Sequence, residues 1–220
     1  MTVDREAMQR SILSQLVVID DFMPDFEAFR ARALAAEYRP LGGGMLETGL
    51  YTDYFGDPAV IERIAGVVGY PLVPADPKGT GRFSLRTSRM TMGLDIHADA
   101  CLIGGILYLN RAEQCQGGTS VFRHHQTGLF AFPSEEEQAR LGLASDSRGY
   151  FQYFCQREGM DRSKWEEVVR AEMKPNRLVL IGGGLFHSHT SVFGNDLNDG
   201  RLVQLYFLDA RDAAGATSAA

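Results

Sequence analysis

Apolar positions in the first third of the chain predict one strand and two helices. The run LVVIDDF, residues 16–22, reads as a strand, and a helix is expected to begin near Asp25. A second helix is expected at Pro58 with Asp57 as its N-cap, because these residues favour the first positions of a helix. The apolar faces of the two helices are formed by Phe26, Phe29 and Ala33 and by Val60, Ile61, Ile64 and Val68.

From about residue 82 the pattern changes to short strand-like runs separated by glycine and polar turns. The runs are RFSLRTSRMTM, CLIGGILYLN, TSVFRHH, RLVLI and RLVQLYFL. Many short strands predict a β-sandwich or barrel. We therefore expect a mostly β core over residues 82–208, a strand and helices in residues 1–80 that pack on the sheet, and a flexible tail over 209–220.

A long insertion, residues 127–174, separates the third run from the fourth, and it is too long for a simple hairpin loop. Two capping boxes, Ser134 with Glu137 and Ser163 with Glu166, predict that the insertion is helical and ends at Pro175. Its aromatic residues fit either a lid over a binding site or a cap that only shields the sheet. These residues are Tyr150, Phe151, Tyr153 and Trp165.

Composition narrows the class of protein. The 220 residues, 45% hydrophobic and 23% charged, fit one globular domain spanning 1–220. The net charge of −6, without a Lys/Arg-rich block, argues against nucleic acid as a partner. No apolar segment has the length of a membrane span or of a signal-peptide core, so we expect a cytoplasmic protein with no membrane association. Three cysteines without Cys-x-x-Cys spacing argue against a disulfide framework and a thiolate zinc site.

Histidines and an aspartate flank two of the predicted strands. In an extended segment His97 and Asp99 point to the same face, so they can bind one metal ion together. His187 and His189 follow the apolar run RLVLI, and either can complete a set of two histidines and one carboxylate. A single His-x-Asp pair is more often a surface hydrogen-bonded pair, but its placement before a strand, with histidines after another, favours metal. The adjacent His124 and His125 should diverge to opposite faces and not act as ligands.

The last predicted strand carries a cation on an apolar face. Its odd positions are Arg201, Val203, Leu205 and Phe207. If this face turns inward, the guanidinium needs an anion, and a small dicarboxylate would satisfy it through a two-pronged contact. The alternative is that Arg201 lies at the strand mouth in water. Arg86 and Arg89, before the His-x-Asp pair, face either an anionic substrate or solvent.

In their order and spacing, these motifs resemble the 2-oxoglutarate and Fe(II)-dependent dioxygenases, closest to their prolyl-hydroxylase-like branch. The likeness covers roughly residues 84–208 and rests on His97-x-Asp99, ILYLN, Gly117-Gly118, KPNRLVLI, His187 with Val192 and Gly194, and Arg201. It implies a double-stranded β-helix (jelly-roll) core with an N-terminal helical layer.

The resemblance also implies a set of site residues and a reaction. His97, Asp99 and His187 would bind iron, while Arg201 and Tyr108 would bind the distal carboxylate of 2-oxoglutarate. With O₂, such an enzyme hydroxylates a C–H bond of an amino-acid-like, peptidyl or other small-molecule substrate and releases succinate and CO₂. The alternatives are a cupin-like metal-binding jelly roll, acting as an isomerase or a non-oxygenase binding module, and an interaction domain that only keeps the fold.

Overall fold

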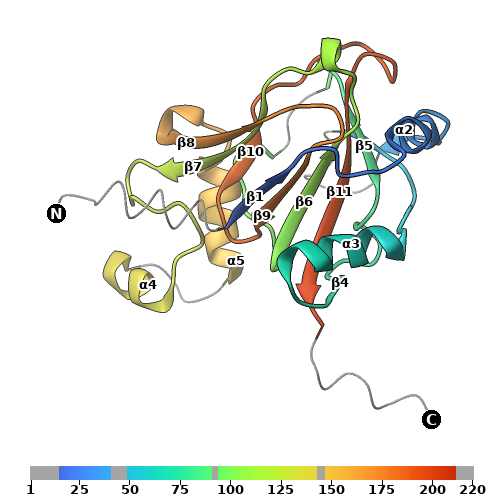
Figure 1. Ribbon diagram of the computed structural model, residues 1–220. Coiled ribbons are helices and arrows are strands. Elements are labelled where there is room, and N and C mark those ends of the chain that lie inside the picture. The colour runs from blue at the N-terminus through green and yellow to red at the C-terminus, as the bar shows by residue number, and fades with distance from the viewer. Residues whose placement is uncertain (1–14, 41–48, 91–93, 143–146, 212–220) are drawn as a thin grey trace.

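Two antiparallel β-sheets form the centre of the structure, a computed structural model that describes residues 15–40, 49–90, 94–142 and 147–211 (Figure 1). Within these residues the larger sheet has eight strands in the order β1-β9-β6-β11-β5-β3-β2, with β4 pairing β11, and the smaller has three in the order β10-β7-β8. The strands are β1 (Leu16–Ile19), β2 (Arg39–Pro40), β3 (Leu50–Tyr51), β4 (Leu72–Pro74), β5 (Phe83–Arg86), β6 (Ile103–Tyr108), β7 (Gly118–His124), β8 (Trp165–Glu172), β9 (Leu178–Gly182), β10 (His187–His189) and β11 (Arg201–Ala210).

Helices lie outside the sheets. The helices are α2 (Phe26–Leu34), α3 (Pro58–Val68), α4 (Glu135–Leu141) and α5 (Ser147–Tyr150), which continues as a π-helix (Phe151–Glu158), together with 3-10 turns at Ala112–Gln114 and Arg162–Lys164. Asp25 caps α2 and Asp57 caps α3 through their side chains, as the sequence predicts. The left-handed Gly69 ends α3, at φ 83°, a conformation that glycine adopts without strain.

The alternation of side chains along the central strands divides the core in two. Leu178 and Leu180 of β9 pack with the apolar faces of α2 and α3. Val179 and Ile181, which point the other way, pack with residues of the smaller sheet such as Val121. The larger sheet therefore has helices on one face and the smaller sheet on the other, which confirms a mostly β fold with flanking helices.

The last part of the insertion, residues 165–172, is a strand, which corrects the helical prediction there. Ser134 and Glu137 do form the expected capping box at the start of α4. Ser163, however, lies in a 3-10 turn capped by Asp161, and residues 165–172 form β8, which pairs with β7. The β-branched Val168 and Val169 favour a pleated strand, and pairing with an existing edge outweighs the local helical spacing.

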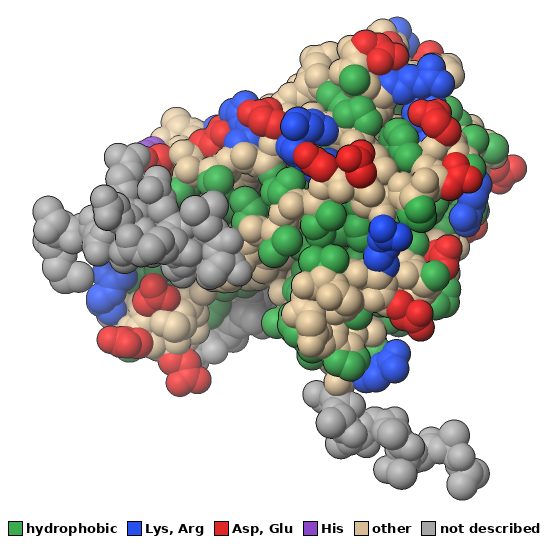
Figure 2. Space-filling model, in the orientation of Figure 1, with side chains coloured by type: hydrophobic (Ala, Val, Ile, Leu, Met, Phe, Trp, Pro, Cys, Tyr) green, Lys and Arg blue, Asp and Glu red, His purple; other side chains and the backbone are tan. Residues whose placement is uncertain are grey.

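Two other expectations need adjustment at their boundaries. Strand β11 extends to Ala210, so the expected tail begins later than residue 209, and residues 212–220 lie outside the described chain. Of the predicted run 82–92 only Phe83–Arg86 forms a strand, and residues 91–93 are outside the description. None of the described helices is long and apolar enough to cross a membrane. The face seen in Figure 2 carries acidic and basic side chains close to one another rather than a field of one sign.

Candidate metal centre

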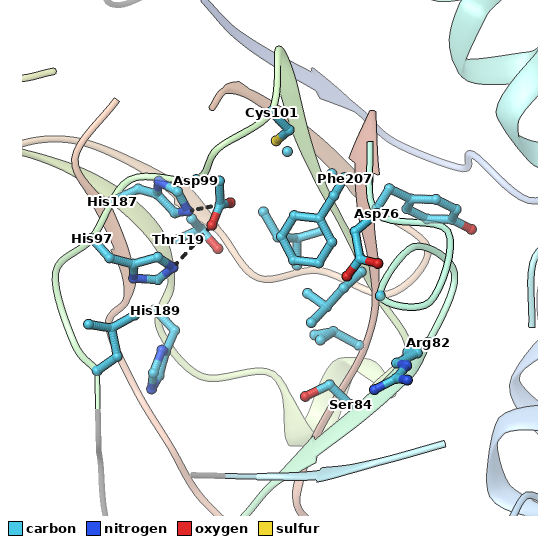
Figure 3. A pocket seen from close by; sticks show the side chains of 18 of the residues that line it. Asp76, Arg82, Ser84, His97, Asp99, Cys101, Thr119, His187, His189 and Phe207 are labelled. Carbon is cyan, nitrogen blue, oxygen red and sulfur yellow. Dashed lines mark ion pairs between the residues drawn. The ribbon is translucent and has the colours of Figure 1, made fainter. Parts of the chain in front are cut away.

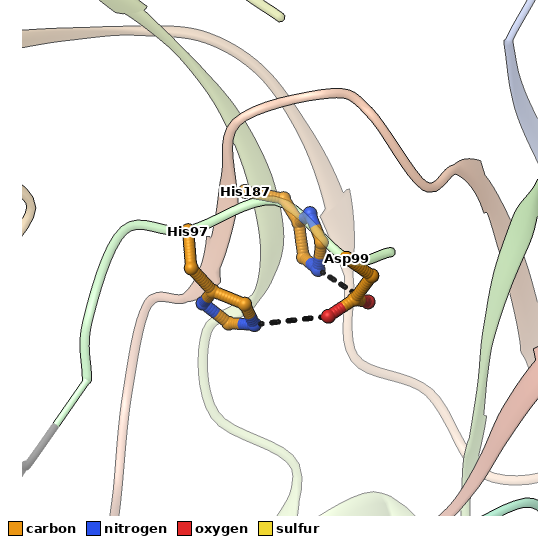
Figure 4. A group of neighbouring side chains, drawn as sticks. All are labelled: His97, Asp99 and His187. Atoms are coloured by element: carbon orange, nitrogen blue, oxygen red, sulfur yellow. Dashed lines mark ion pairs between the residues drawn. The ribbon is translucent and has the colours of Figure 1, made fainter. Parts of the chain in front are cut away.

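His97, Asp99 and His187 meet at one end of the space between the sheets (Figures 3 and 4). A pair of backbone hydrogen bonds holds His97 opposite His187, with N to O distances of 3.0 and 2.7 Å. Asp99 is fixed by its own N–H, which donates to the carbonyl of Gly183 at 2.8 Å. A Cβ on Gly183 would lie 2.0 Å from the carbonyl oxygen of Cys101, so only glycine permits this approach. The three side chains offer ligand atoms that all lie within 4.8 Å of one another.

Both histidines are oriented by backbone carbonyls. Nδ1 of His97 lies 2.7 Å from the carbonyl oxygen of Asp95, and Nδ1 of His187 lies 2.8 Å from that of Leu185. Because a carbonyl oxygen only accepts, each Nδ1 carries a proton, and Nε2 is the atom through which each ring can bind a metal when the ring is neutral. These Nε2 atoms face the Asp99 carboxylate at 3.7 and 3.4 Å. This geometry needs a cation between the rings and the carboxylate, which is a proton on Nε2 in the metal-free group, and two imidazole nitrogens with one carboxylate are also a donor set that fits a divalent metal.

In the metal-free group the two histidines differ in their pKa shifts. Burial lowers the pKa of His97 and favours its neutral, metal-binding form. Burial acts in the same direction on His187, but the hydrogen bond and charge of Asp99 outweigh it and raise the pKa of His187. Burial acts to raise the pKa of Asp99, but the two histidines outweigh it and lower that pKa, so the carboxylate stays ionised.

An ion-pair network in which Asp95 and Ser188 are buried and Arg162 is exposed supports the ligand group. Arg162 donates from Nε and Nη2 to the two carboxylate oxygens of Asp95 at 2.6 and 2.7 Å. Ser188 donates to the same carboxylate at 2.5 Å, and Arg162 also donates to the carbonyl of His189. Asp95, Ser188 and Arg162 therefore tie the segment of His97 to β10. Sequence reasoning missed this network, since 67 positions separate Arg162 from Asp95.

A cavity of about 480 Å³ opens beside the ligand group, within the range of small-molecule pockets. The odd face of β11 lines it, as the sequence predicts: Arg201, Val203, Leu205 and Phe207. Phe151 of the insertion also reaches the cavity, whereas Tyr150 and Trp165 pack in a separate core.

Arg201 is buried in this cavity rather than solvated at a strand mouth. Its side chain lies over the ring of Tyr108, with the guanidinium carbon 5.7 Å from the ring centre, and it is 5% exposed. Its Nε has no hydrogen-bond partner among the described residues. Burial lowers the pKa of Arg201 to about 10. The Tyr108 hydroxyl is hydrogen-bonded to Thr119 at 2.7 Å.

The other histidines lie apart from the ligand group. His189 lines the cavity, but the group of mutually close ligand atoms includes His187 and not His189. His124 is buried against Trp165, with ring centres 4.7 Å apart, while His125 is exposed. The two adjacent rings thus diverge as the sequence predicts.

A comparison with known protein families identifies a family that includes this chain. Residues 84–208 match a family described as a family of unknown function, DUF6445. The chain belongs to this family. A search of curated protein sequences finds no match to this DUF6445 protein.

Solved structures share the fold of this DUF6445 protein at low sequence identity. HygX from Streptomyces hygroscopicus with nickel and 2-oxoglutarate bound is 14% identical, with a TM-score of 0.52, over 94% of this chain and 87% of HygX. HygX with nickel, 2-oxoglutarate and hygromycin B gives a TM-score of 0.53 at the same identity and coverage. SnoK, a non-heme α-ketoglutarate-dependent carbocyclase from nogalamycin biosynthesis, is 14% identical with a TM-score of 0.53, over 94% of this chain and 83% of SnoK. The DUF6445 protein therefore has the fold of these enzymes.

Proposed function

We propose that this DUF6445 protein is an Fe(II)- and 2-oxoglutarate-dependent dioxygenase that hydroxylates a C–H bond of a small-molecule substrate. The observation that carries the proposal is the group of His97, Asp99 and His187, whose ligand atoms lie within 4.8 Å of one another beside a cavity. The fold shared with HygX and SnoK supports it, and the two sheets would correspond to a double-stranded β-helix core. Membership of the prolyl-hydroxylase-like branch stays a prediction.

The two Nε2 atoms and the Asp99 carboxylate would hold Fe(II). A set of two histidines and one carboxylate supplies only three ligands, and this arrangement suits non-haem Fe(II) oxygenases because positions stay open for other molecules. When bound, Fe(II) supplies the redox chemistry by which O₂ and 2-oxoglutarate become succinate and CO₂ and the substrate gains a hydroxyl group. The protein's part is to fix the ligands: Asp95 and Leu185 orient the rings through their carbonyls.

Arg201 would bind the distal carboxylate of 2-oxoglutarate. Its guanidinium is buried, positively charged and supplied with no carboxylate partner by the described residues, so an anionic ligand would relieve an unfavourable burial. The planar guanidinium matches a carboxylate through two parallel hydrogen bonds. Tyr108 lies under the same guanidinium, and its hydroxyl is hydrogen-bonded to Thr119, which lines the cavity.

Apolar walls around the site would exclude water from the reacting atoms. Val203, Leu205 and Phe207 line the cavity between Arg201 and the ligand group. A dry surrounding strengthens the pairing of Arg201 with its carboxylate and protects reactive species from water.

Cyclisation of the substrate is a second candidate, favoured by the shared fold with the carbocyclase SnoK. The two reactions consume the same cosubstrate but differ in their product. Hydroxylation adds one oxygen atom to the substrate, whereas ring closure removes two hydrogen atoms. Mass spectrometry of the product separates them once a substrate is known.

An anaerobic titration tests the proposed function without a substrate. Addition of Fe(II) and then 2-oxoglutarate to the protein should produce a weak visible charge-transfer band, and Asp99→Ala should lose it. His125→Ala, which changes an exposed histidine away from the group, is the matched control and should keep the band. A wild-type protein that binds Fe(II) but gives no band with 2-oxoglutarate would favour the cupin-like alternative.

A further inference from the structure

Strand β5 presents a polar face to the cavity. Phe83 and Leu85 point into the core shared with the helices, so the alternate residues Arg82, Ser84 and Arg86 point the other way and line the cavity. Figure 3 shows Arg82 and Ser84 on the opposite side of the cavity from the metal-binding group. Two more arginines therefore face the space that holds Arg201, and the proposed function uses neither of them.

The side chain of Arg82 lacks a partner among the described residues, although its backbone carbonyl accepts the N–H of Leu205. Its Nε is buried without a hydrogen bond, and no described carboxylate forms an ion pair with its side chain. Asp76 lines the same side of the cavity, but one of its carboxylate oxygens accepts the backbone N–H of Lys78 at 2.9 Å. Nη2 of Arg86 donates to the hydroxyl of Tyr51 at 3.4 Å, while its Nη1 is buried without a partner among the described residues. A partly buried guanidinium without an acceptor is unfavourable, so the position of Arg82 favours an anionic ligand.

The strand register separates Arg82 from the cosubstrate end of the cavity. Arg86 lies directly opposite Arg201 across the β5–β11 ladder. Arg82 lies four residues before Arg86, just ahead of β5, a backbone distance of about 13 Å at the usual rise of a strand. A carboxylate bound at Arg201 is thus within the neighbourhood of Arg86 but belongs to a different part of the cavity from Arg82.

The net charge of the residues that line the cavity also favours the binding of a second anion. Among the described lining residues, three arginines face two carboxylates, those of Asp76 and Asp99. Fe(II) would add two positive charges and 2-oxoglutarate two negative ones. One positive charge then stays uncompensated with the cosubstrate in place, and a cavity of low dielectric constant favours an incoming molecule that cancels it.

We propose that Arg82, with Ser84 beside it, binds the carboxylate of a small anionic substrate on the side of the cavity opposite the metal-binding group. This inference rests on the proposed function, because it assumes that 2-oxoglutarate binds at Arg201 and leaves the part of the cavity near Arg82 to the substrate. It narrows the substrate class to small molecules that carry a carboxylate group. The neutral amides or esters of the same molecules would bind poorly.

The test compares benzoate with benzamide, two probes of nearly the same shape that differ in charge. Each is titrated calorimetrically, without oxygen, into the protein loaded with Fe(II) and saturating 2-oxoglutarate, so that Arg201 is already occupied. Benzoate should bind more tightly than benzamide. Arg82→Gln should weaken benzoate binding about 10- to 100-fold, the range for a lost hydrogen bond to a charged group, and leave benzamide unchanged. Arg82→Lys should restore part of the affinity, because it keeps the charge.

Two further variants locate the effect. Arg89→Gln changes an exposed arginine just beyond β5 and should leave benzoate binding unchanged. Arg86→Gln should reduce benzoate binding less than Arg82→Gln does. The affinity for 2-oxoglutarate should change by less than about threefold in Arg82→Gln, a free-energy difference too small for a lost ion pair.

The outcomes separate this inference from the proposed function. Absence of the charge-transfer band in the wild type contradicts the proposed function, and titration of benzoate into the metal-free protein then tests Arg82 by itself. With the band present, the inference is overturned by any of three results: equal or unmeasurable binding of benzoate and benzamide, a loss that follows Arg86 instead of Arg82, or displacement of 2-oxoglutarate by benzoate.

Discussion

Replacement of Arg201 by methionine should have two opposite effects, weaker binding of 2-oxoglutarate and a more stable metal-free protein. The wild-type guanidinium is 5% exposed, and its Nε has no acceptor among the described residues. Arg86 lies opposite it in the strand ladder and adds a like charge. Methionine has a similar length and no charge, so it can fill the space without the penalty of burying a cation.

The structure sets the size of both effects. Burial lowers the pKa of Arg201 to about 10, well below its usual value, and each tenfold change in the acid constant corresponds to about 1.4 kcal/mol. The charged side chain is therefore destabilised by about 3 kcal/mol in the folded protein. This is the upper limit of the gain in stability, because the methionine variant also loses the contact with Tyr108. For 2-oxoglutarate, removal of one half of a partly buried charge pair costs about 2–5 kcal/mol, or roughly 30-fold to several thousand-fold in affinity.

The assay measures unfolding and cosubstrate binding on the same samples. The metal-free Arg201→Met variant should melt at a higher temperature than the wild type, by about 2–4 °C for each kcal/mol gained. With Fe(II) and 2-oxoglutarate the order should reverse, because ligand binding stabilises only the protein that retains affinity. Arg201→Lys should recover part of the 2-oxoglutarate affinity. A methionine variant that melts no higher than the wild type and binds 2-oxoglutarate equally well would refute the assignment of Arg201.

Three further substitutions test the ligand group. Asp99→Ala should abolish succinate formation, since it removes the anionic ligand, and turnover at the wild-type rate would contradict the metal assignment. His187→Ala should lose iron while His189→Ala keeps most of it, because only the first lies within the group of close ligand atoms; metal analysis after anaerobic reconstitution measures both, and the reverse pattern would exchange their roles. Asp95→Asn keeps the backbone carbonyl that orients His97 but removes the charge that pairs with Arg162, and it should weaken metal binding about 10- to 100-fold, the usual effect of changing the residues that support metal ligands. Competition with a chelator measures this affinity, and an unchanged value would make the Asp95–Arg162 ion pair purely structural.

The sequence predicts correctly those helices and strands whose formation depends on residues close together in the chain. Asp57 and Pro58 place the start of α3 because capping depends on a few adjacent residues. Alternation places Arg201, Val203, Leu205 and Phe207 on one face of β11, and the structure shows that this face lines the cavity. Strand β8 was mispredicted because Ser163 and Glu166 have the spacing of a capping box, while the strand depends on pairing with β7, about forty residues earlier.

The residues of the candidate site also differ in this respect: those close together in the chain could be predicted, and partners far apart could not. His97 and Asp99 share a face because they are two residues apart, and His187 could be joined to them only through a resemblance in motif order. The Asp95–Arg162–Ser188 network left no such trace, since an aspartate two residues before His97 gives no indication of a partner 67 positions away. The cavity arginine Arg82 was missed for a similar reason: its strand was predicted, but which face of β5 turns inward depends on the helices that cover the other face.

The unfavourable contacts of the charged groups that line the cavity share one physical explanation. Nε2 of each histidine faces the Asp99 carboxylate, an arrangement that needs a proton or a metal ion between them, and Arg82 and Arg201 each have a buried guanidinium nitrogen without an acceptor among the described residues. Each arrangement destabilises the folded chain by itself, and each is relieved by a ligand of the opposite charge: a cation between the histidines and Asp99, and an anion at each arginine. Metal, cosubstrate and substrate would then bind more tightly, because each of them relieves one of these unfavourable contacts. If so, the metal-free protein should be stabilised stepwise by Fe(II), 2-oxoglutarate and a carboxylate probe, each step depending on its own residues.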